Sequence, residues 1–250
     1  MKILIILIRW KGGVGRVVSS IKPLLEKAGN KVEVISREDD LKCYSLKNSF
    51  KKLRQEVKSR NYDILYTQDW SCALPFLFKR NHYTCFHGNE PTKSKVLQTL
   101  IGNIMGKNIV AVGPLLKKRF PKSNLIYNGV DFNKFKDLHK KRDKIGWIKK
   151  ESESINEEDF KRLARENQLE PTIAENIPSE KMNDWYNSLK VFVSLPPESA
   201  GFNLCWLEAK SSGVPKILGN ENGIGIRNIE KYWKGMSWEN HVNKLLKVIK

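Results

Sequence analysis

The sequence has few cysteines and histidines and no long apolar run. Its 250 residues include four of each, and the cysteines lack the paired spacing of a zinc site. We therefore interpret Cys43, Cys72, Cys85 and Cys205 as reduced, structural thiols of a cytoplasmic protein. The longest apolar run, residues 3–8, is much shorter than the ~20 residues of a membrane span, and we interpret it as a buried strand.

Acidic residues are scarce in the first half of the chain. The whole sequence carries 45 Lys and Arg against 27 Asp and Glu, a net charge of +18. Residues 1–140 contain 27 of these basic residues and 11 of the acidic ones. A merely lysine-rich, solvated surface would spread the charge evenly. The asymmetry favours an anionic partner for this half: a membrane surface, a nucleic acid or another polyanionic acceptor.

Strand-like and helix-like segments alternate along the whole chain. Strands are expected near residues 2–8, 32–35, 63–67, 83–86, 109–112, 125–127, 144–148, 172–177, 191–195 and 215–218. Helices are expected near residues 17–28, 50–57, 96–104, 115–120, 160–164, 182–189, 204–211 and 238–249. The alternation predicts a parallel, doubly wound α/β fold. Because residues 137–144 are almost purely polar, we expect a linker there, between domains 1–140 and 141–250.

The N-terminal half carries candidate binding residues at strand ends. Gly12 and Gly13 follow the first strand and precede a helix, where glycine lets backbone N–H groups approach a phosphate; a simple tight turn is the alternative. His87 follows the fourth strand, where it could bind a sugar hydroxyl or serve as a capped, structural histidine. Asp69 holds the corresponding position after the third strand.

The segment 191–215 contains the strongest signal for a binding site. A buried strand leads into a Pro/Ser/Gly loop and then into a helix whose second turn carries Glu208. Residues 199–203 can present backbone N–H groups to a diphosphate at the helix start. Glu208 could accept hydrogen bonds from ribose hydroxyls. The alternative, a solvated helix glutamate, fits poorly with the apolar neighbours Leu207 and Ala209.

These motifs occur in the order found in one large enzyme family. They are Gly12-Gly13, His87-Gly88, Tyr127-Asn128-Gly129-Val130-Asp131, Gly201-Phe202, Glu208-Ala209 and Gly213-Val214-Pro215. In them the chain resembles the GT-B glycosyltransferases, specifically the retaining family 4, with a shortened C-terminal domain. The resemblance implies two Rossmann-like domains whose parallel sheets face each other across a cleft. It also implies a hexosyltransferase-type reaction that is metal-independent, needs no cofactor and uses a UDP- or GDP-sugar as co-substrate.

The resemblance also implies roles for individual residues. His87 would contact the transferred sugar and Glu208 would hold the donor ribose, as the two candidate catalytic residues. Gly12 and Gly13 would approach the donor phosphates. Further candidates for donor binding are Lys149, Lys150, Glu198, Ser199, Gly201, Phe202 and Asn203.

The sequence departs from the family at three donor-binding positions, one of which is Asn203 in place of the usual second Gly. Ala200 stands where the family has the first Glu of its paired motif, and Trp147 aligns with a phosphate-binding Arg. A catalytically inactive, GT-B-like binding module is therefore one alternative. A nucleic-acid-binding or DNA-glycosylating protein, which would use the same basic half, is another.

The basic half is the acceptor side in the family. In residues 49–60, five Lys and Arg surround an apolar line of Phe50, Leu53 and Val57. Such a helix can lie on an anionic membrane, or it can turn its apolar line into the core and leave its charges in water. Our hypothesis is a peripheral enzyme at the inner face of the membrane, with a lipid-linked or membrane-borne acceptor.

Overall fold

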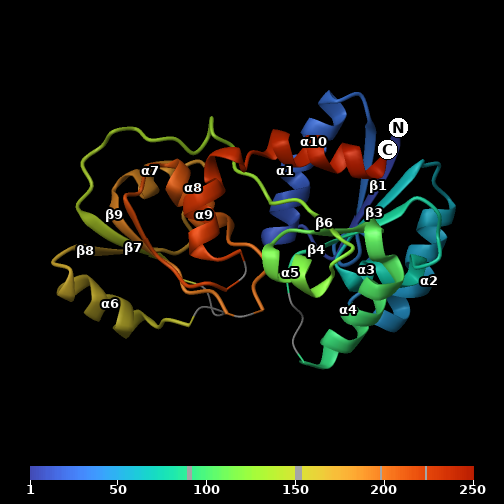
Figure 1. The fold of residues 1–250 in the computed structure, drawn as a ribbon, viewed down its shortest axis with the longest axis horizontal. Coiled ribbons are helices and arrows are strands. Elements are labelled where there is room, and N and C mark those ends of the chain that lie inside the picture. The colour runs from blue at the N-terminus through green and yellow to red at the C-terminus, as the bar shows by residue number, and fades with distance from the viewer. Residues whose placement is uncertain (89–91, 150–153, 198, 223) are drawn as a thin grey trace. The chain divides into compact units, whose positions relative to one another are not determined.

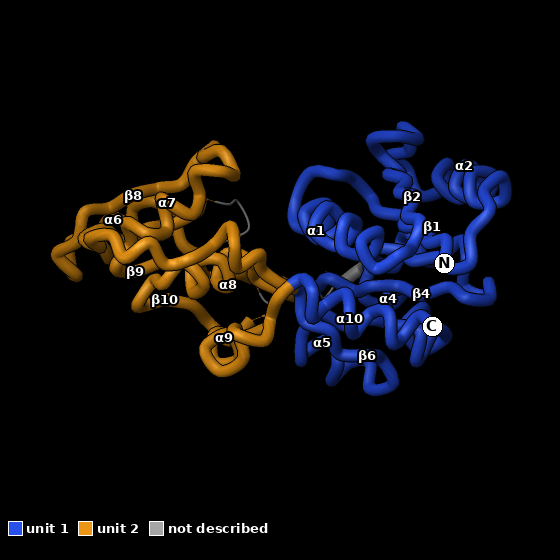
Figure 2. The backbone as a smooth tube through the Cα atoms, turned by 90° about the horizontal axis from the view of Figure 1, so that it is seen from above, with its two compact units in different colours: residues 1–128, 238–250 blue, residues 129–237 orange. Residues whose placement is uncertain are grey.

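The chain forms two compact units, each built on a parallel sheet. The computed structural model describes residues 1–88, 92–149, 154–197, 199–222 and 224–250 (Figure 1). Unit 1 comprises residues 1–128 and 238–250, and unit 2 comprises residues 129–237 (Figure 2). All strand pairs in both sheets are parallel. The predicted α/β class is confirmed.

Unit 1 has a six-stranded sheet in the order β2-β1-β3-β4-β5-β6. Its strands are β1 (Lys2–Leu7), β2 (Lys31–Ser36), β3 (Ile64–Gln68), β4 (His82–Phe86), β5 (Ile109–Ala111) and β6 (Asn124–Leu125). Its helices are α1 (Gly13–Lys27), α2 (Leu46–Lys58), α3 (Trp70–Ala73), α4 (Thr92–Met105), α5 (Pro114–Arg119) and α10 (Trp238–Ile249), with short 3-10 turns η1 (Leu74–Phe76) and η2 (Gly106–Asn108).

The core of unit 1 explains why its first residues are so apolar. Ile3 to Leu7 are buried completely or nearly so, because β1 is an inner strand of the sheet with both faces covered. On one face, Leu53 and Val57 of α2 pack with Leu4 and Ile6 of β1. The apolar line of the 49–60 segment is therefore used by the core. Its four most exposed basic residues, Lys51, Lys52, Arg54 and Lys58, face solvent.

Unit 2 has a four-stranded sheet in the order β10-β9-β7-β8. Its strands are β7 (Lys144–Ile148), β8 (Glu170–Ala174), β9 (Leu189–Val193) and β10 (Lys216–Leu218). Its helices are α6 (Glu157–Glu166), α7 (Met182–Asn187), α8 (Leu204–Ser211) and α9 (Ile226–Tyr232), with the 3-10 turn η3 (Trp233–Gly235). Ile145 and Trp147 of β7 pack with Phe160 of α6 and Val191 of β9 in the core.

The structure divides the chain differently from the predicted boundary at residue 140. Residues 129–143 belong to unit 2. The Arg142 guanidinium donates hydrogen bonds to Asp137 Oδ1 at 2.7 Å, Asn187 Oδ1 at 3.0 Å and the Ser212 carbonyl at 2.8 Å. Gly213, at φ +78°, makes room for this contact, because a Cβ there would lie 2.3 Å from Asp137 Oδ2. The segment is polar because it hydrogen-bonds along α7 and α8, and it is not a free linker.

The closing helix α10 returns to unit 1, whereas the sequence prediction placed it in the C-terminal domain. It packs beside α1 (Figure 1). Val242, Leu245 and Ile249 are buried on its apolar face. Amphipathic spacing predicts that a helix covers a core, but it does not show which core.

Candidate functional site

The glycine turn between β1 and α1 leaves a helix N-terminus open. Gly12 has φ +98° and stands as the N-cap of α1, where no side chain supplies a cap bond. A Cβ on Gly13 would meet nothing within 4 Å, whereas a Cβ on Gly15 would lie 1.7 Å from the Trp10 carbonyl oxygen. Gly15 is therefore required by packing, while the space beside Gly13 is open. Backbone N–H groups with partial positive charge line that space.

Asp39 anchors this turn from the segment that follows β2. Its Oδ2 accepts the backbone N–H of Trp10 at 2.6 Å and the hydroxyl of Ser36 at 2.9 Å. These hydrogen bonds lower the pKa of Asp39. The ionised carboxylate thus fixes the chain two residues before Gly12, although sequence reasoning did not identify it.

Asp69 and His87 meet at the carboxyl ends of β3 and β4. Asp69 Oδ1 accepts the backbone N–H of His87 at 3.3 Å. The backbone of Asp69 has φ 68° and ψ 162°, a region that essentially only glycine occupies without strain. Burial raises the pKa of Asp69 to about 6. A strained, desolvated carboxylate at the edge where α/β sheets bind ligands is a candidate functional group.

The His87 imidazole is neutral and held in one orientation. Its Nε2 lies 2.7 Å from Gln68 Oε1. An amide oxygen only accepts hydrogen bonds, so Nε2 carries the proton and Nδ1 carries the lone pair. Burial lowers the pKa of His87 to about 4. At neutral pH the ring therefore offers an acceptor nitrogen and no positive charge.

Three further polar groups accompany this pair, none of which the sequence pointed to. Gln68 Nε2, Ser71 Oγ and Arg37 Nε are buried and have no hydrogen-bond partner among the described residues. An unpaired buried polar atom costs ~1–3 kcal/mol, so each is a place where a ligand or water would be stabilising. Arg37 follows β2, Gln68 ends β3 and Ser71 lies in α3. Their unpaired polar atoms make the carboxyl end of the sheet suited to a hydroxyl-rich ligand.

His241 reaches the same part of unit 1 from α10. Its Nδ1 lies 2.9 Å from the Tyr127 carbonyl oxygen, so Nδ1 donates and Nε2 carries the lone pair. That Nε2 is buried and has no partner within the described ranges. Burial lowers the pKa of His241 to about 4, and a proton on His87 would lower the pKa of His241 further. No local signal could have placed His241 near His87, because the two residues are far apart in the sequence.

In unit 2, the loop after β9 ends at the N-terminus of α8. Asn203 is the N-cap residue, but its side chain makes no cap bond and its Nδ2 is buried without a partner in the described part of the chain. No acidic residue stands in the first turn. Gly201 is buried, Phe202 is half-buried and Ser199 is exposed. This helix start can accept an anion through its backbone N–H groups.

Glu208 lies in α8 and is 6% exposed, which rules out the alternative of a solvated helix glutamate. Its Oε2 accepts the Tyr186 hydroxyl at 3.1 Å. Tyr186 belongs to α7, so this bond joins two helices of unit 2. The bond from Tyr186 therefore orients the Glu208 carboxylate.

One predicted donor-binding residue, Lys149, and the position of the family's phosphate-binding Arg are placed less favourably for binding a phosphate. Lys149 Nζ pairs with Glu157 Oε2 at 3.1 Å, and that hydrogen bond raises the pKa of Lys149. Trp147, which aligns with the family's phosphate-binding Arg, is buried and its ring packs 5.6 Å from that of Phe160. The candidates Lys150 and Glu198 lie outside the described residues.

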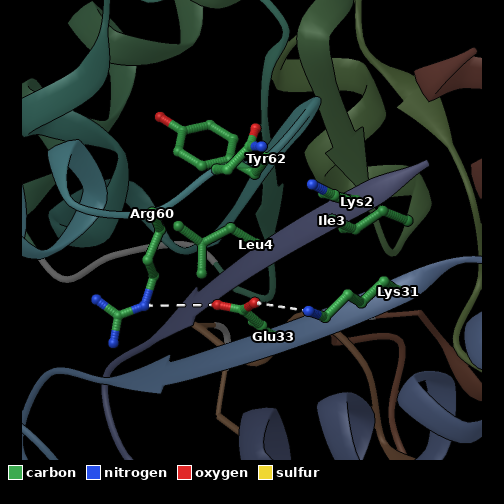
Figure 3. A pocket seen from close by; sticks show the side chains of 8 residues that line it. Lys2, Ile3, Leu4, Lys31, Glu33, Arg60 and Tyr62 are labelled. Atoms are coloured by element: carbon green, nitrogen blue, oxygen red, sulfur yellow. Dashed lines mark ion pairs between the residues drawn. The ribbon is translucent and has the colours of Figure 1, made fainter.

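The amino ends of β1 and β2, opposite the candidate site, are closed by side chains. A hollow there is lined by residues from the amino ends of β1 and β2 and from the segment before β3. Glu33 points toward Lys31 at 3.8 Å and Arg60 at 3.6 Å (Figure 3). The hollow has essentially no free volume. We therefore assign this edge to stabilising contacts and the candidate site to the carboxyl ends.

Comparison with known proteins identifies the fold. No protein-family model and no curated protein matches the chain, but solved structures do. Sucrose-phosphate synthase from Thermosynechococcus elongatus matches with a TM-score of 0.63 at 13% identity, over 99% of this chain and 94% of that one. The lipopolysaccharide outer core galactosyltransferase WaaB matches at 0.61 and 14%, over 100% and 90%.

Anabaena HepE in complex with UDP-glucose matches at a TM-score of 0.58 and 14% identity, over 99% of this chain and 94% of that one. The chain has the GT-B fold. The predicted pair of Rossmann-like units with parallel sheets is thereby confirmed, since each match covers nearly the whole chain. In a GT-B fold, the turn at Gly12 and the start of α8 stand at the carboxyl ends of the two sheets, where ligands of α/β proteins bind.

Proposed function

We propose that this chain is a glycosyltransferase that moves a sugar from a nucleotide-diphosphate sugar to an acceptor. The observation that carries the proposal is a pair of helix N-termini without side-chain caps. One is α1 after Gly12, and the other is α8 after Asn203. Each follows a strand of a parallel sheet, and each suits a phosphate group. The similarity to a structure that holds UDP-glucose supports a nucleotide-sugar donor.

In the proposed mechanism, unit 2 binds the nucleotide part of the donor. The backbone N–H groups of residues 201–203 and of the first turn of α8 hold the diphosphate, and Glu208 accepts hydrogen bonds from the ribose. As the bond from the anomeric carbon to the diphosphate oxygen breaks, negative charge grows on that oxygen. Fixed N–H donors at this point stabilise the charge without reorganisation.

Unit 1 binds the transferred sugar and the acceptor. His87 contacts the sugar near the reacting carbon, with its neutral ring as hydrogen-bond acceptor. The acceptor oxygen forms its new bond on the face from which the diphosphate leaves, and its proton passes to a leaving phosphate oxygen. The configuration at the anomeric carbon is therefore retained, and no protein nucleophile or metal takes part in the step. Gln68 and Ser71 donate to hydroxyls of the bound sugars.

The test measures nucleotide release from UDP- and GDP-sugars, with EDTA included to examine metal independence. Glu208→Gln removes the charge that holds the ribose and keeps an oxygen for Tyr186. We expect turnover to fall by about a hundredfold or more, equivalent to ~2.7 kcal/mol. Glu166→Gln on the exposed face of α6 is the matched control. Full activity of Glu208→Gln would show that the donor site is misplaced.

A donor-binding module without turnover is the second candidate. It is favoured by the burial of Trp147 and by the ion pair of Lys149 with Glu157, because these two positions then supply no free cation to a diphosphate. Thermal-shift measurements with UDP, GDP and their sugars separate the two functions. Stabilisation by a nucleotide without any sugar transfer or hydrolysis would support the module.

A further inference from the structure

Helix α4 carries an apolar stripe that faces solvent. Four of its side chains are strongly exposed: Val96 at 72%, Leu97 at 37%, Leu100 at 53% and Ile104 at 43%. They are spaced so that they share one face of the helix. The sequence pattern predicted a helix here, and the structure turns these apolar residues outward.

The opposite face of α4 is fixed, so the stripe cannot simply rotate inward. Gln98, Ile101 and Met105 are buried on that face. Gly102 lies directly against the Phe120 ring, where a Cβ would come within 2.1 Å of a ring carbon. The helix is therefore packed through glycine and held in this orientation.

Arg119 of α5 adds a polar anchor to that face. Its guanidinium donates to Gln98 Oε1 at 2.6 Å, to the Lys95 carbonyl at 2.8 Å and to Thr99 Oγ1 at 2.5 Å. Leu115, one turn before Arg119 on α5, is 40% exposed. The apolar stripe and α5 thus belong to one rigid surface, and Figure 1 shows α4 at the periphery of unit 1.

The charged residues in the segment that carries the stripe are all basic. Residues 92–130 contain six Lys and one Arg and no Asp or Glu. Lys95, Lys107, Lys118 and Lys122 are exposed. Lys122 also lines a hollow of about 320 Å³ between the end of α4 and the segment after α5. Unit 1 as a whole has 27 Lys and Arg against 10 Asp and Glu, whereas unit 2 has 18 against 17.

We propose that α4 and the start of α5 form the surface through which unit 1 binds an anionic lipid bilayer. An exposed apolar stripe next to lysines is what interfacial binding requires: the apolar side chains enter the boundary with the acyl chains, and the lysines meet the anionic headgroups. A nucleic acid would use the lysines but not the stripe. A second copy would bring like charges together around it. None of the helices in the described residues is long and apolar enough to cross a membrane.

This surface replaces the 49–60 segment as the membrane contact. α2 has more exposed basic residues, but its apolar line is in the core. Binding to lipid at α4 does not require catalysis. Only the link to a membrane-borne acceptor rests on the proposed function.

The experiment is flotation of the full chain with vesicles of phosphatidylcholine, with and without phosphatidylglycerol, at low and high salt. We expect binding only with phosphatidylglycerol, weakened by salt. Leu100→Ser combined with Ile104→Ser should weaken binding at least roughly tenfold by removing apolar contact. Lys118→Gln with Lys122→Gln should weaken it by a similar factor. The matched control, Lys51→Gln with Lys58→Gln on α2, removes the same charge and should leave most of the binding.

Equal losses from both lysine pairs, or no loss from the Leu100 and Ile104 variant, would overturn the assignment to α4. A concentration-dependent dimer that the same apolar variant abolishes would assign the stripe to a second copy instead. Because these four side chains are exposed, the variants should retain the wild-type melting temperature. Nucleotide release from a soluble donor is measured on the same proteins, so failure of docking is distinguishable from failure of the proposed transferase activity.

Discussion

The carboxylate of Asp69 accepts the backbone N–H of His87 at 3.3 Å, and the preceding residue, Gln68, holds the His87 ring at 2.7 Å. Two neighbouring residues at the end of β3 therefore fix both the main chain and the side chain of His87. Asp69 has a strained backbone, with φ of 68°, and is the N-cap residue of α3. This strained residue is part of the structure that holds His87. The candidate site of unit 1 is thus built across the β3 and β4 ends.

Asp69→Asn should stabilise the protein at neutral pH. Burial raises the pKa of Asp69 from 3.8 to about 6, so the folded state is penalised wherever the carboxylate is ionised. The penalty is absent below pH 3.8 and complete above pH 6, where it reaches up to about 3 kcal/mol. We expect Asp69→Asn to unfold at higher urea concentration than wild type at pH 7.5 but not at pH 3.5. Equal stability at pH 7.5 would contradict the raised pKa.

Unit 1 should lose stability in mild acid because of its buried histidines. Burial lowers the pKa of His82, His87 and His241 to about 4, from 6.5. In the unfolded chain all three bind protons as the pH falls below 6.5, while in the folded chain they do not. Stability is therefore fully present above pH 6.5 and is lost toward pH 4.

Denaturant unfolding between pH 7.5 and pH 4 tests this expectation. His82→Gln should reduce the slope of the unfolding free energy against pH by the equivalent of about one bound proton. His139→Gln is the control, because His139 lies in unit 2 and its side chain is 89% exposed. A stability that does not vary across this range would contradict the burial of these three rings.

Alanine at Gly13 and at Gly15 should separate binding from folding. A Cβ at Gly15 would lie 1.7 Å from the Trp10 carbonyl oxygen, so Gly15→Ala should destabilise unit 1 by several kcal/mol or prevent folding. A Cβ at Gly13 meets nothing, so Gly13→Ala should keep the wild-type melting temperature. If Gly13 faces donor phosphates as proposed, the affinity for nucleotide sugar should still fall. Calorimetric titration with UDP-glucose measures that loss, and an unchanged affinity would remove Gly13 from the site.

Arg119→Ala should loosen α4. It leaves Gln98 Oε1 and the Lys95 carbonyl without their charged donor, and a hydrogen bond to a charged group contributes ~1.5–3 kcal/mol. Amide hydrogen exchange in α4 should accelerate, while exchange in α2 stays slow. Lys118→Ala, which removes an exposed charge from the same short helix, is the control. Unchanged protection of α4 in Arg119→Ala would show that packing against Phe120 holds the helix by itself.

The sequence predicted the strands well, for a definite physical reason. Strands buried on both faces read as apolar runs, as in β1 and β9, and the helix at 204–211 was predicted with its bounds as observed. The short helices α3 (Trp70–Ala73) and α9 (Ile226–Tyr232) were missed, because α3 has only four residues and Ile229 is the one buried residue of α9, so neither shows a periodic apolar face. The sequence also did not show that the apolar face of α4 is exposed, because periodicity identifies an apolar face but not what packs against that face.

The candidate site was predictable only where function depends on local sequence. Gly12 and His87 follow strands, and Glu208 follows a loop and a helix start, so their positions could be inferred. Asp39 and His241 act through tertiary neighbours, Trp10 and Tyr127, that no spacing rule connects to them. The roles assigned to Gly12, His87 and Glu208 stay predictions until the experiments above are done.

The return of α10 to unit 1 has a consequence for biosynthesis. Unit 2 is an insertion between residues 128 and 238, so residues 1–128 emerge from the ribosome before the last piece of their own core. Leu245 and Ile249, which are fully or nearly buried, are made after the whole of unit 2. Helix α10 therefore cannot pack against α1 and complete the core of unit 1 until the whole of unit 2 has been translated.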